Sequence, residues 1–251
     1  MLLATSANRG VSMNVREWDA LAKTFADEVC DIVRLDRHDL IGSTLARHGF
    51  REDFGTALDA GCGVGTFALR HASRFRRVTA IDSSPKLLER ARLRCAQLKN
   101  VQWQCAGIDE FARSLKSTFD AIVCFNVVTA TSSTRRARTM RALVKMLQPK
   151  GLLLLVVPSL ESINFVRGVA RGRWTRRFPP ITSAGIVDTD GFRQKYYSVA
   201  DLRSAVSAAA GRVLELSPIT YTWTSEGLPS PQGVCRQEPW DWLCVVSRAH
   251  P

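Results

Sequence analysis

The sequence predicts an α/β fold, in which a doubly wound and mostly parallel sheet of seven strands carries helices on both faces. Three observations support this class. Short apolar segments alternate with helical patterns, as in a parallel sheet with helical crossovers. A glycine-rich turn at residues 59–66 follows the first apolar segment. Acidic or amide residues end the following segments, which indicates a ligand site at the carboxyl edge of the sheet.

Seven segments have the length and composition of strands. They are residues 56–60, 78–81, 101–106, 119–125, 152–157, 213–223 and 240–246. Between them, apolar residues recur at three- and four-residue steps, which predicts helices. These patterns cover residues 15–47, with a second helix from residue 39, and then 67–73, 84–98, 134–147 and 198–210. Ser84 is suited to cap its helix and Pro85 to occupy the first helical position.

The length of 251 residues is that of one domain with one or two additions. We therefore treat residues 1–251 as a single domain. Residues 1–13 lack the charged start and apolar core of a signal peptide, and we expect a flexible leader there. Residues 14–50 are expected to form N-terminal helices. Residues 159–197 are too long for a plain connection, and we expect them to form a lid or substrate-binding insertion.

The composition, 45% hydrophobic and 23% charged, is typical of a soluble globular enzyme. The longest apolar run, residues 151–158, is too short to cross a bilayer. Seven scattered cysteines without a C-x-x-C pair favour reduced thiols and a cytoplasmic location. The four histidines have no metal-site spacing, so we expect no metal. The sequence leaves the oligomeric state open.

The formal net charge of +12 fits a nucleic-acid partner, an anionic small substrate or an arginine-rich genome. One set of basic residues shares a predicted helix with an apolar face, and we interpret this set as the ordinary solvated face of that helix. It comprises Arg135, Arg136, Arg138, Arg141 and Lys145. A denser group lies in the expected lid and favours an anionic acceptor. It comprises Arg167, Arg171, Arg173, Arg176 and Arg177.

The glycine turn has the spacing G-x-G-x-G and is preceded by an acid. Glycine tolerates positive φ and lets a ligand approach backbone N–H groups. The G-x-G-x-x-G spacing of dinucleotide binders is not met, and no G-x-x-x-x-G-K-[ST] loop occurs. The turn therefore favours a nucleotide-like ligand without a pyrophosphate. The simpler alternative is a plain connection between a strand and a helix.

Further motifs follow the turn in a fixed order. Asp82 ends the second strand, Asp109 follows the third and Asn126 ends the fourth, while residues 148–155 lead into the fifth. This order, over about residues 55–158, resembles the class I (Rossmann-like) methyltransferases that use S-adenosylmethionine (SAM). The resemblance implies SAM as cofactor, S-adenosylhomocysteine (SAH) as product, and a seven-stranded sheet whose last strand is antiparallel.

The resemblance also implies a role for each matched position. Gly61 and Gly63 would let the backbone approach the methionine and ribose portions of SAM, in a turn completed by Gly65. Asp59 would shape this turn and orient the amino end of the ligand. Asp82 would accept hydrogen bonds from both ribose hydroxyls, for which the two oxygens of a carboxylate are suited.

The remaining implied contacts follow the next strands. Ser83, directly after the second strand, is also expected to contact the cofactor. Ile108 would pack against the adenine and Asp109 would lie near its amino group, with the adjacent Glu110 as the alternative. Asn126 would bind the cofactor near the transferred methyl group.

The catalytic residues are less well defined. Many relatives carry the run N-V-L-E-H after the fourth strand, but here Ala130 replaces the histidine, so no general base is assigned. Displacement at an activated methyl relies largely on proximity and alignment, whereas a hydroxyl nucleophile favours a base. We predict Asn126, Glu161 and Tyr197 as catalytic residues. Other candidates are Tyr196 and Glu226 as bases, Trp223 and Glu226 as substrate contacts, and Trp242 as a core residue.

These observations predict an enzyme that transfers a methyl group from SAM to a small-molecule acceptor, possibly anionic, enclosed by the lid and the N-terminal helices. The first alternative is an RNA methyltransferase acting on rRNA or tRNA through the basic surface. The second is a SAM-binding protein without turnover. A dehydrogenase is the least favoured. We expect no membrane partner.

Overall fold

The computed structural model describes residues 14–24, 31–115, 118–170, 180–189, 192–225, 227–231, 233 and 235–249. Its main sheet has seven strands in the order β3-β2-β1-β4-β5-β9-β8. They are β1 (Thr56–Ala60), β2 (Arg77–Asp82), β3 (Val101–Cys105), β4 (Phe119–Phe125), β5 (Leu147–Pro158), β8 (Gly211–Thr220) and β9 (Trp240–Arg248). All neighbours pair in parallel except β9, which runs against both β5 and β8. The predicted fold class is confirmed.

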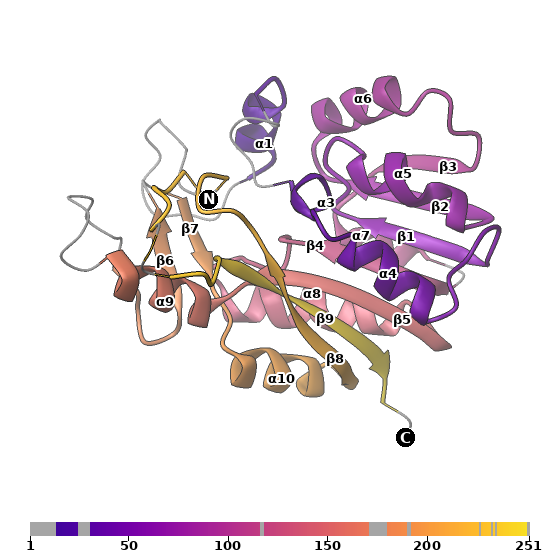
Figure 1. The fold of residues 1–251 in the computed structure, drawn as a ribbon. Coiled ribbons are helices and arrows are strands. Elements are labelled where there is room, and N and C mark those ends of the chain that lie inside the picture. The colour runs from indigo at the N-terminus through magenta and orange to yellow at the C-terminus, as the bar shows by residue number, and fades with distance from the viewer. Residues whose placement is uncertain are drawn as a thin grey trace.

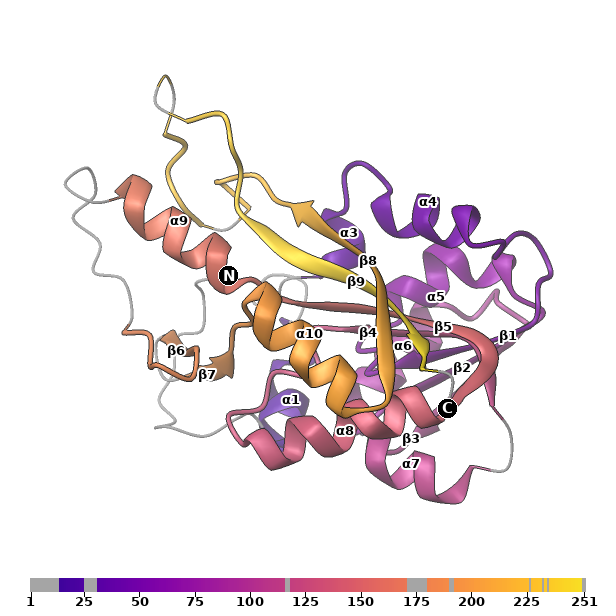
Figure 2. The ribbon, with the colours of Figure 1, turned by 90° about the horizontal axis from the view of Figure 1, so that it is seen from below.

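Helices cover both faces of the sheet (Figure 1). One face carries α3 (Ile32–Leu35), α4 (Leu40–Arg47), α5 (Thr66–His71) with the short 3-10 helix Ala72–Arg74, and α6 (Pro85–Arg94). The other carries α7 (Ile108–Ser114), α8 (Ser133–Lys145) and α10 (Val199–Ala208), and Figure 2 shows α8 and α10 from below. Successive residues of β4 enter the two cores in turn, as the period of a strand requires. Ala121 and Val123 face one core, and Ile122 and Cys124 face the other.

The observed elements differ from the predicted ones at α7, a helix that the sequence pattern did not indicate, and at the start of β5. We expected the fifth strand to begin at residue 152, but β5 already begins at Leu147. Phe119 pairs with Leu147 and Ala121 with Leu152, so the intervening residues form an irregularity within the strand pair. The preceding helix accordingly ends at Lys145.

The N-terminal helical pattern is divided among short helices. α1 (Val15–Leu21) begins with a capping box, in which Asn14 accepts from the backbone of Glu17 and the Glu17 side chain accepts from Asn14. α3 is capped by Asp31. The predicted second helix, from residue 39, corresponds to α4. The predicted leader, residues 1–13, lies outside the described residues.

Within the segment 159–197, the structure shows the helix α9 (Leu160–Ala170) and a hairpin of β6 (Ile186–Thr189) and β7 (Phe192–Lys195). The hairpin is bound to the sheet edge, since the Lys195 N–H donates to the carbonyl of Thr129 and the Tyr197 N–H to that of Pro158. The buried Lys195 ammonium donates to Asp201 Oδ2 at 2.5 Å and to a backbone carbonyl. Four residues of the predicted arginine cluster lie outside the described residues, namely Arg171, Arg173, Arg176 and Arg177.

Among the helices in the described ranges, none combines the length and the apolar character that a membrane span requires.

Gly65 is expected to tolerate no side chain. Its φ is +77°, and a Cβ atom there would lie 2.9 Å from Trp103 Cη2 and 3.2 Å from Ala91 Cβ. We predict that Gly65→Ala lowers the free energy of unfolding by about 1–3 kcal/mol, measured by urea denaturation. The control is Gly168→Ala on the exposed face of α9, where no atom lies within 4 Å. That change should raise stability by about 0.5–1 kcal/mol, and equal losses at both sites would contradict the packing argument.

Candidate active site

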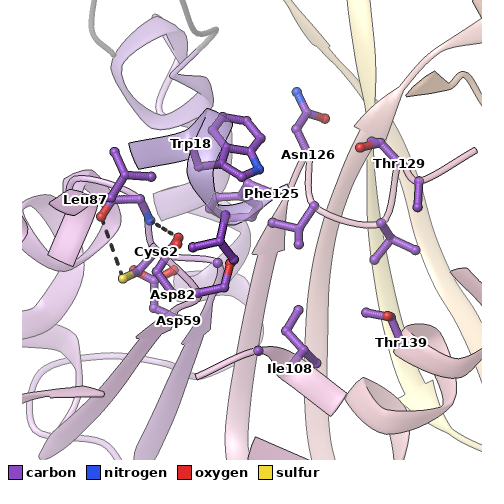
Figure 3. Close-up of a pocket in the computed structure, with 18 of the residues that line it drawn as sticks. Trp18, Asp59, Cys62, Asp82, Leu87, Ile108, Phe125, Asn126, Thr129 and Thr139 are labelled. Carbon is purple, nitrogen blue, oxygen red and sulfur yellow. Dashed lines mark hydrogen bonds between the residues drawn. The ribbon is translucent and has the colours of Figure 1, made fainter. Parts of the chain in front are cut away.

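A cavity of about 600 Å³ opens at the carboxyl edge of the sheet. Its wall is formed by the glycine turn after β1, the end of β2, the start of α7 and the residues after β4, and residues of α1, α3, α8 and β7 complete the lining. Figure 3 shows Asp59 and Asp82 deep on one side, Ile108 below, and Trp18 and Asn126 toward the upper end. Parallel strands bring their carboxyl ends to one edge, which explains why residues far apart in sequence meet here.

The glycine turn lies directly against this cavity. Gly61 and Gly63 line it with φ values of +82° and +52°. A Cβ atom on Gly61 would approach Val127 Cγ2 to 2.4 Å. Gly65 does not line the cavity and instead packs at the start of α5 against Trp103. Two glycines of the motif therefore border the cavity, and the third is required by packing.

Asp82, the last residue of β2, is hydrogen-bonded to the glycine turn. Its Oδ2 accepts from the Gly63 N–H at 2.9 Å and its Oδ1 from the Ser84 N–H at 2.8 Å. Burial raises the pKa of Asp82, against the backbone donors of Ser84 and Gly63, which lower it. A carboxylate has about four acceptor lone pairs, so acceptor capacity remains for a ligand in the cavity. Ser83 lines the cavity beside it.

Asp59 is fully buried, and its Oδ2 has no hydrogen-bond partner. Burial, together with the charges of Asp82 and Asp31, raises its pKa to about 8. Asp31 also lines the cavity, and its Oδ2 accepts from the hydroxyl of Thr66 at 2.6 Å. This end of the cavity is therefore acidic and suits a cationic group, which would relieve the repulsion among the three carboxylates.

Ile108 and Asp109 line the cavity from the first turn of α7, and Glu110 lines it beside them. The Asp109 carboxylate is held by α8, because its Oδ2 accepts from Arg138 Nε at 2.6 Å and its Oδ1 from Thr139 Oγ1 at 3.4 Å. The sequence did not indicate this link between α7 and α8.

Asn126 lines the cavity at the end of β4 and has a φ of +54°, rare for a residue with a side chain. Its Nδ2 donates to Asp241 Oδ2 at 3.2 Å. Its Oδ1 is buried and has no hydrogen-bond partner. The sequence did not predict Asp241, which lies 115 positions further along the chain.

Glu161 and Tyr197, predicted as catalytic, do not line the cavity. The Tyr197 hydroxyl donates to the carbonyl of Val128 at 2.7 Å, and burial raises its pKa. The Glu161 carboxylate accepts from Trp242 Nε1 at 3.0 Å and from the Val199 N–H at 2.9 Å. Both side chains attach the segment 159–197 to the rest of the fold.

The other candidates from the C-terminal part also lie away from the cavity lining. Tyr196 is buried, and its hydroxyl accepts from Gln194. Trp223 is buried against α9, and its Nε1 donates to the carbonyl of Gln237. It is therefore a packing residue rather than the substrate contact that we expected. Glu226 lies outside the described residues.

The arginines of α8 are not simply a solvated face, and that interpretation was wrong in part. Arg135, Arg136 and Arg138 line the cavity, together with Arg113 of α7 and Arg193 of β7. We call these five residues the basic rim. α8 begins shortly after the end of β4, which places its first turns beside the cavity.

Members of the basic rim differ in their partners. Arg136 donates to the carbonyls of Ala130 and Thr131 at 2.6 and 2.8 Å, and Arg138 is paired with Asp109. Arg193 Nε lies 3.9 Å from Asp188. Within the part of the chain that the structure describes, the guanidinium groups of Arg113 and Arg135 have neither an ion-pair nor a hydrogen-bond partner. The described residues also hold no group of three or more potential metal ligands.

The sheet order, the glycine turn and the acid at the end of β2 define the class I methyltransferases. Residues 57–151 match the methyltransferase domain family. The chain therefore carries a methyltransferase domain with the class I fold and is a SAM-dependent methyltransferase, whose cofactor is SAM. The buried acidic end, the open glycines and the remaining acceptor sites of Asp82 fit this cofactor.

Three relatives illustrate the family. The chain is 26% identical over 177 residues to a ubiquinone biosynthesis O-methyltransferase of Xanthomonas campestris, covering 70% of each chain. It is 33% identical over 96 residues to nodulation protein S of Sinorhizobium fredii, covering 38% of this chain and 44% of that one. The crystal structure of the N-methyltransferase NodS from Bradyrhizobium japonicum with SAH shares the fold at 16% identity, with a TM-score of 0.62 over 94% and 98% of the chains.

The raised pKa of Asp59 predicts a pH-dependent stability. Between about pH 4 and 8 the native state keeps a proton on Asp59 that the unfolded chain has released. Wild-type stability therefore falls as the pH rises through this window, by up to about 1.4 kcal/mol per pH unit. We predict that Asp59→Asn removes this decline, so that the variant gains on the wild type between pH 5 and pH 9 in urea unfolding. Parallel curves would contradict the assignment, and Asp53→Asn, at an exposed carboxylate, is the control.

Proposed function

We propose that this enzyme transfers the methyl group of SAM to a small-molecule acceptor that carries an anionic group, which binds at the basic rim. The observation that carries this proposal is the division of charge in one cavity. Three carboxyl groups lie at or beside the glycine turn, namely Asp31, Asp59 and Asp82, whereas the five guanidinium groups of the basic rim outnumber the two acids of α7, Asp109 and Glu110, in the rest of the lining. A cationic cofactor and an anionic acceptor would each meet the opposite charge.

We assign the cofactor end as follows. Asp82 accepts hydrogen bonds from the ribose diol. Asp59 faces the ammonium group of SAM, whose positive charge offsets the repulsion between Asp59 and the neighbouring carboxylates. Gly61 and Gly63 allow close approach of the backbone. Ile108 packs on the adenine beside Ser83 and Asp109. When bound, SAM supplies a methyl group activated by a sulfonium sulfur. The protein then needs mainly to align a nucleophile with it.

The acceptor side is assigned to the part of the cavity near Asn126, Thr129 and Phe192, which share its lining with the basic rim. A small acceptor is supported by the cavity volume of about 600 Å³ and by the relatives, whose names refer to O-methylation in ubiquinone biosynthesis and to N-methylation. Arg113 and Arg135 are the rim residues best suited to an anion, because their charges are not engaged within the described structure.

The cofactor assignment is tested by calorimetric titration with SAH. We predict that Asp82→Ala weakens SAH binding at least tenfold, a loss of about 1.4 kcal/mol or more, because the ribose loses a charged acceptor. Asp82→Asn keeps one acceptor oxygen and should fall in between. Glu89→Ala, on the exposed side of α6, should bind like the wild type. Binding of NAD in place of SAH, or wild-type affinity in Asp82→Ala, would overturn the assignment.

The acceptor assignment is tested with paired acceptors that differ by one carboxylate, such as 3,4-dihydroxybenzoate and catechol. We predict a lower KM for the carboxylate member, and a rise of about tenfold in that KM for Arg135→Ala, equal to about 1.4 kcal/mol. Arg141→Ala, on α8 but outside the cavity lining, should leave it unchanged. Inhibition of the reaction by bulk tRNA at low salt and its steep relief by added salt would instead favour an RNA acceptor.

A further inference from the structure

The antiparallel strand β9 brings an unexpected acid to the active-site edge. The parallel strands β4 and β5 end at this edge, and so does β8, whereas β9 begins there because it runs the other way (Figure 1). Asp241 is the second residue of β9 and pairs with Pro158 of β5 and Ile219 of β8. The end of β4 lies across β5, and there Asn126 reaches Asp241.

The contacts of Asp241 fix the orientation of the Asn126 amide. Asp241 Oδ2 accepts from Asn126 Nδ2 at 3.2 Å and from the Tyr221 hydroxyl at 3.3 Å. An ionised carboxylate only accepts hydrogen bonds, so it selects the nitrogen of the amide and turns the oxygen away. The backbone of Asn126 is held as well, because its N–H donates to the carbonyl of Val156. The amide has therefore one defined orientation.

The oxygen of this amide is left without a partner. Asn126 Oδ1 is buried, unbonded and part of a residue that lines the cavity. A buried acceptor without a donor is costly, and such an atom at a site commonly indicates a ligand group that completes it. The complementary group is a hydrogen-bond donor.

We propose that Asp241 is a positioning residue, which presents Asn126 Oδ1 to the nucleophilic atom of the methyl acceptor. This inference rests on the proposed function of the cavity. It defines the methylated atom as one that bears hydrogen, a hydroxyl oxygen or an amine nitrogen. The anionic group of the acceptor is then a separate group, bound at the basic rim, because a carboxylate at Oδ1 would face a repelling oxygen.

The resulting reaction is balanced without a further reactant. The acceptor oxygen or nitrogen forms a bond to the methyl carbon as the carbon–sulfur bond breaks, and the sulfur keeps the electron pair of that bond. The proton of the acceptor is released to water. Asn126 Oδ1 holds that proton by a hydrogen bond and thereby directs a lone pair of the nucleophile toward the methyl carbon.

An exchange of the two side chains tests the proposal. In Asp241→Asn the carboxylate that selects the amide orientation is lost, and in Asn126→Asp two carboxylates face each other. We expect kcat with 3,4-dihydroxybenzoate to fall at least tenfold in each, while the SAH dissociation constant changes less than threefold. The double variant Asn126→Asp/Asp241→Asn again pairs an amide nitrogen with a carboxylate and leaves one oxygen for the cavity. It should regain kcat to within about threefold of the wild type.

Two results would overturn the proposal, a wild-type kcat in Asp241→Asn or a double variant no better than the weaker single variant. Tyr221→Phe is the matched control, because it removes the hydrogen bond from the Tyr221 hydroxyl to the same oxygen and keeps the Asn126 contact, and it should cost less than threefold in kcat. A merely structural role of Asp241 would lower SAH binding and thermal stability together with kcat, whereas positioning of the nucleophile lowers kcat alone.

A readout without an acceptor separates this inference from the proposed function. In the SAH complex, the NMR signals of the Asn126 side-chain amide should show one strongly protected proton, which is lost in Asp241→Ala. Absence of that protection in the wild type overturns the positioning by Asp241. Protection without turnover of any paired acceptor overturns the proposed function and leaves the amide orientation supported.

Discussion

The hydrogen bonds between the glycine turn and the end of β2 are the constraint on which the whole site depends. The carbonyl of Ile81 accepts from the N–H groups of Gly61 and Cys62, at 2.8 and 2.9 Å, while the carboxylate of Asp82 accepts from Gly63. Backbone donors of one turn are thus bound to the last two residues of a neighbouring strand. This arrangement keeps the turn open toward the cavity. It also sets the distance between the acidic end and the end of β4, because Gly61 packs against Val127.

The local features of the site could be predicted because they obey short-range rules. Ser84 caps α6 by accepting from the Leu87 N–H, and Pro85 is the first helical residue, as the sequence indicates. The positive φ values in the glycine turn follow from the residue type. The mostly parallel sheet follows from the alternation of strands and helices, and its antiparallel strand from the family resemblance.

The remaining features depend on tertiary neighbours. The pattern of α8 identifies its apolar face, but it does not tell which surface Arg135 and Arg138 meet, so their place at the cavity was missed. Glu161 and Tyr197 lie near the end of strand β5, as predicted catalytic residues should. Their side chains, however, are hydrogen-bonded to Trp242 and to the carbonyl of Val128, respectively. Asp241 was missed because only the reversal of β9 brings it to the edge where Asn126 lies.

The reversal of β9 also bears on how the molecule can change. The connection between β8 and β9 emerges at the cavity edge, yet none of its described residues within 221–239 lines the cavity. Glu238, near its end, pairs with Arg37 between α3 and α4, so the connection is tied to the helical layer that packs beside the glycine turn. Replacing this loop would remove that tie without adding a new cavity wall. Redesign of the enzyme is therefore better directed at the first turns of α8, whose side chains do line the cavity.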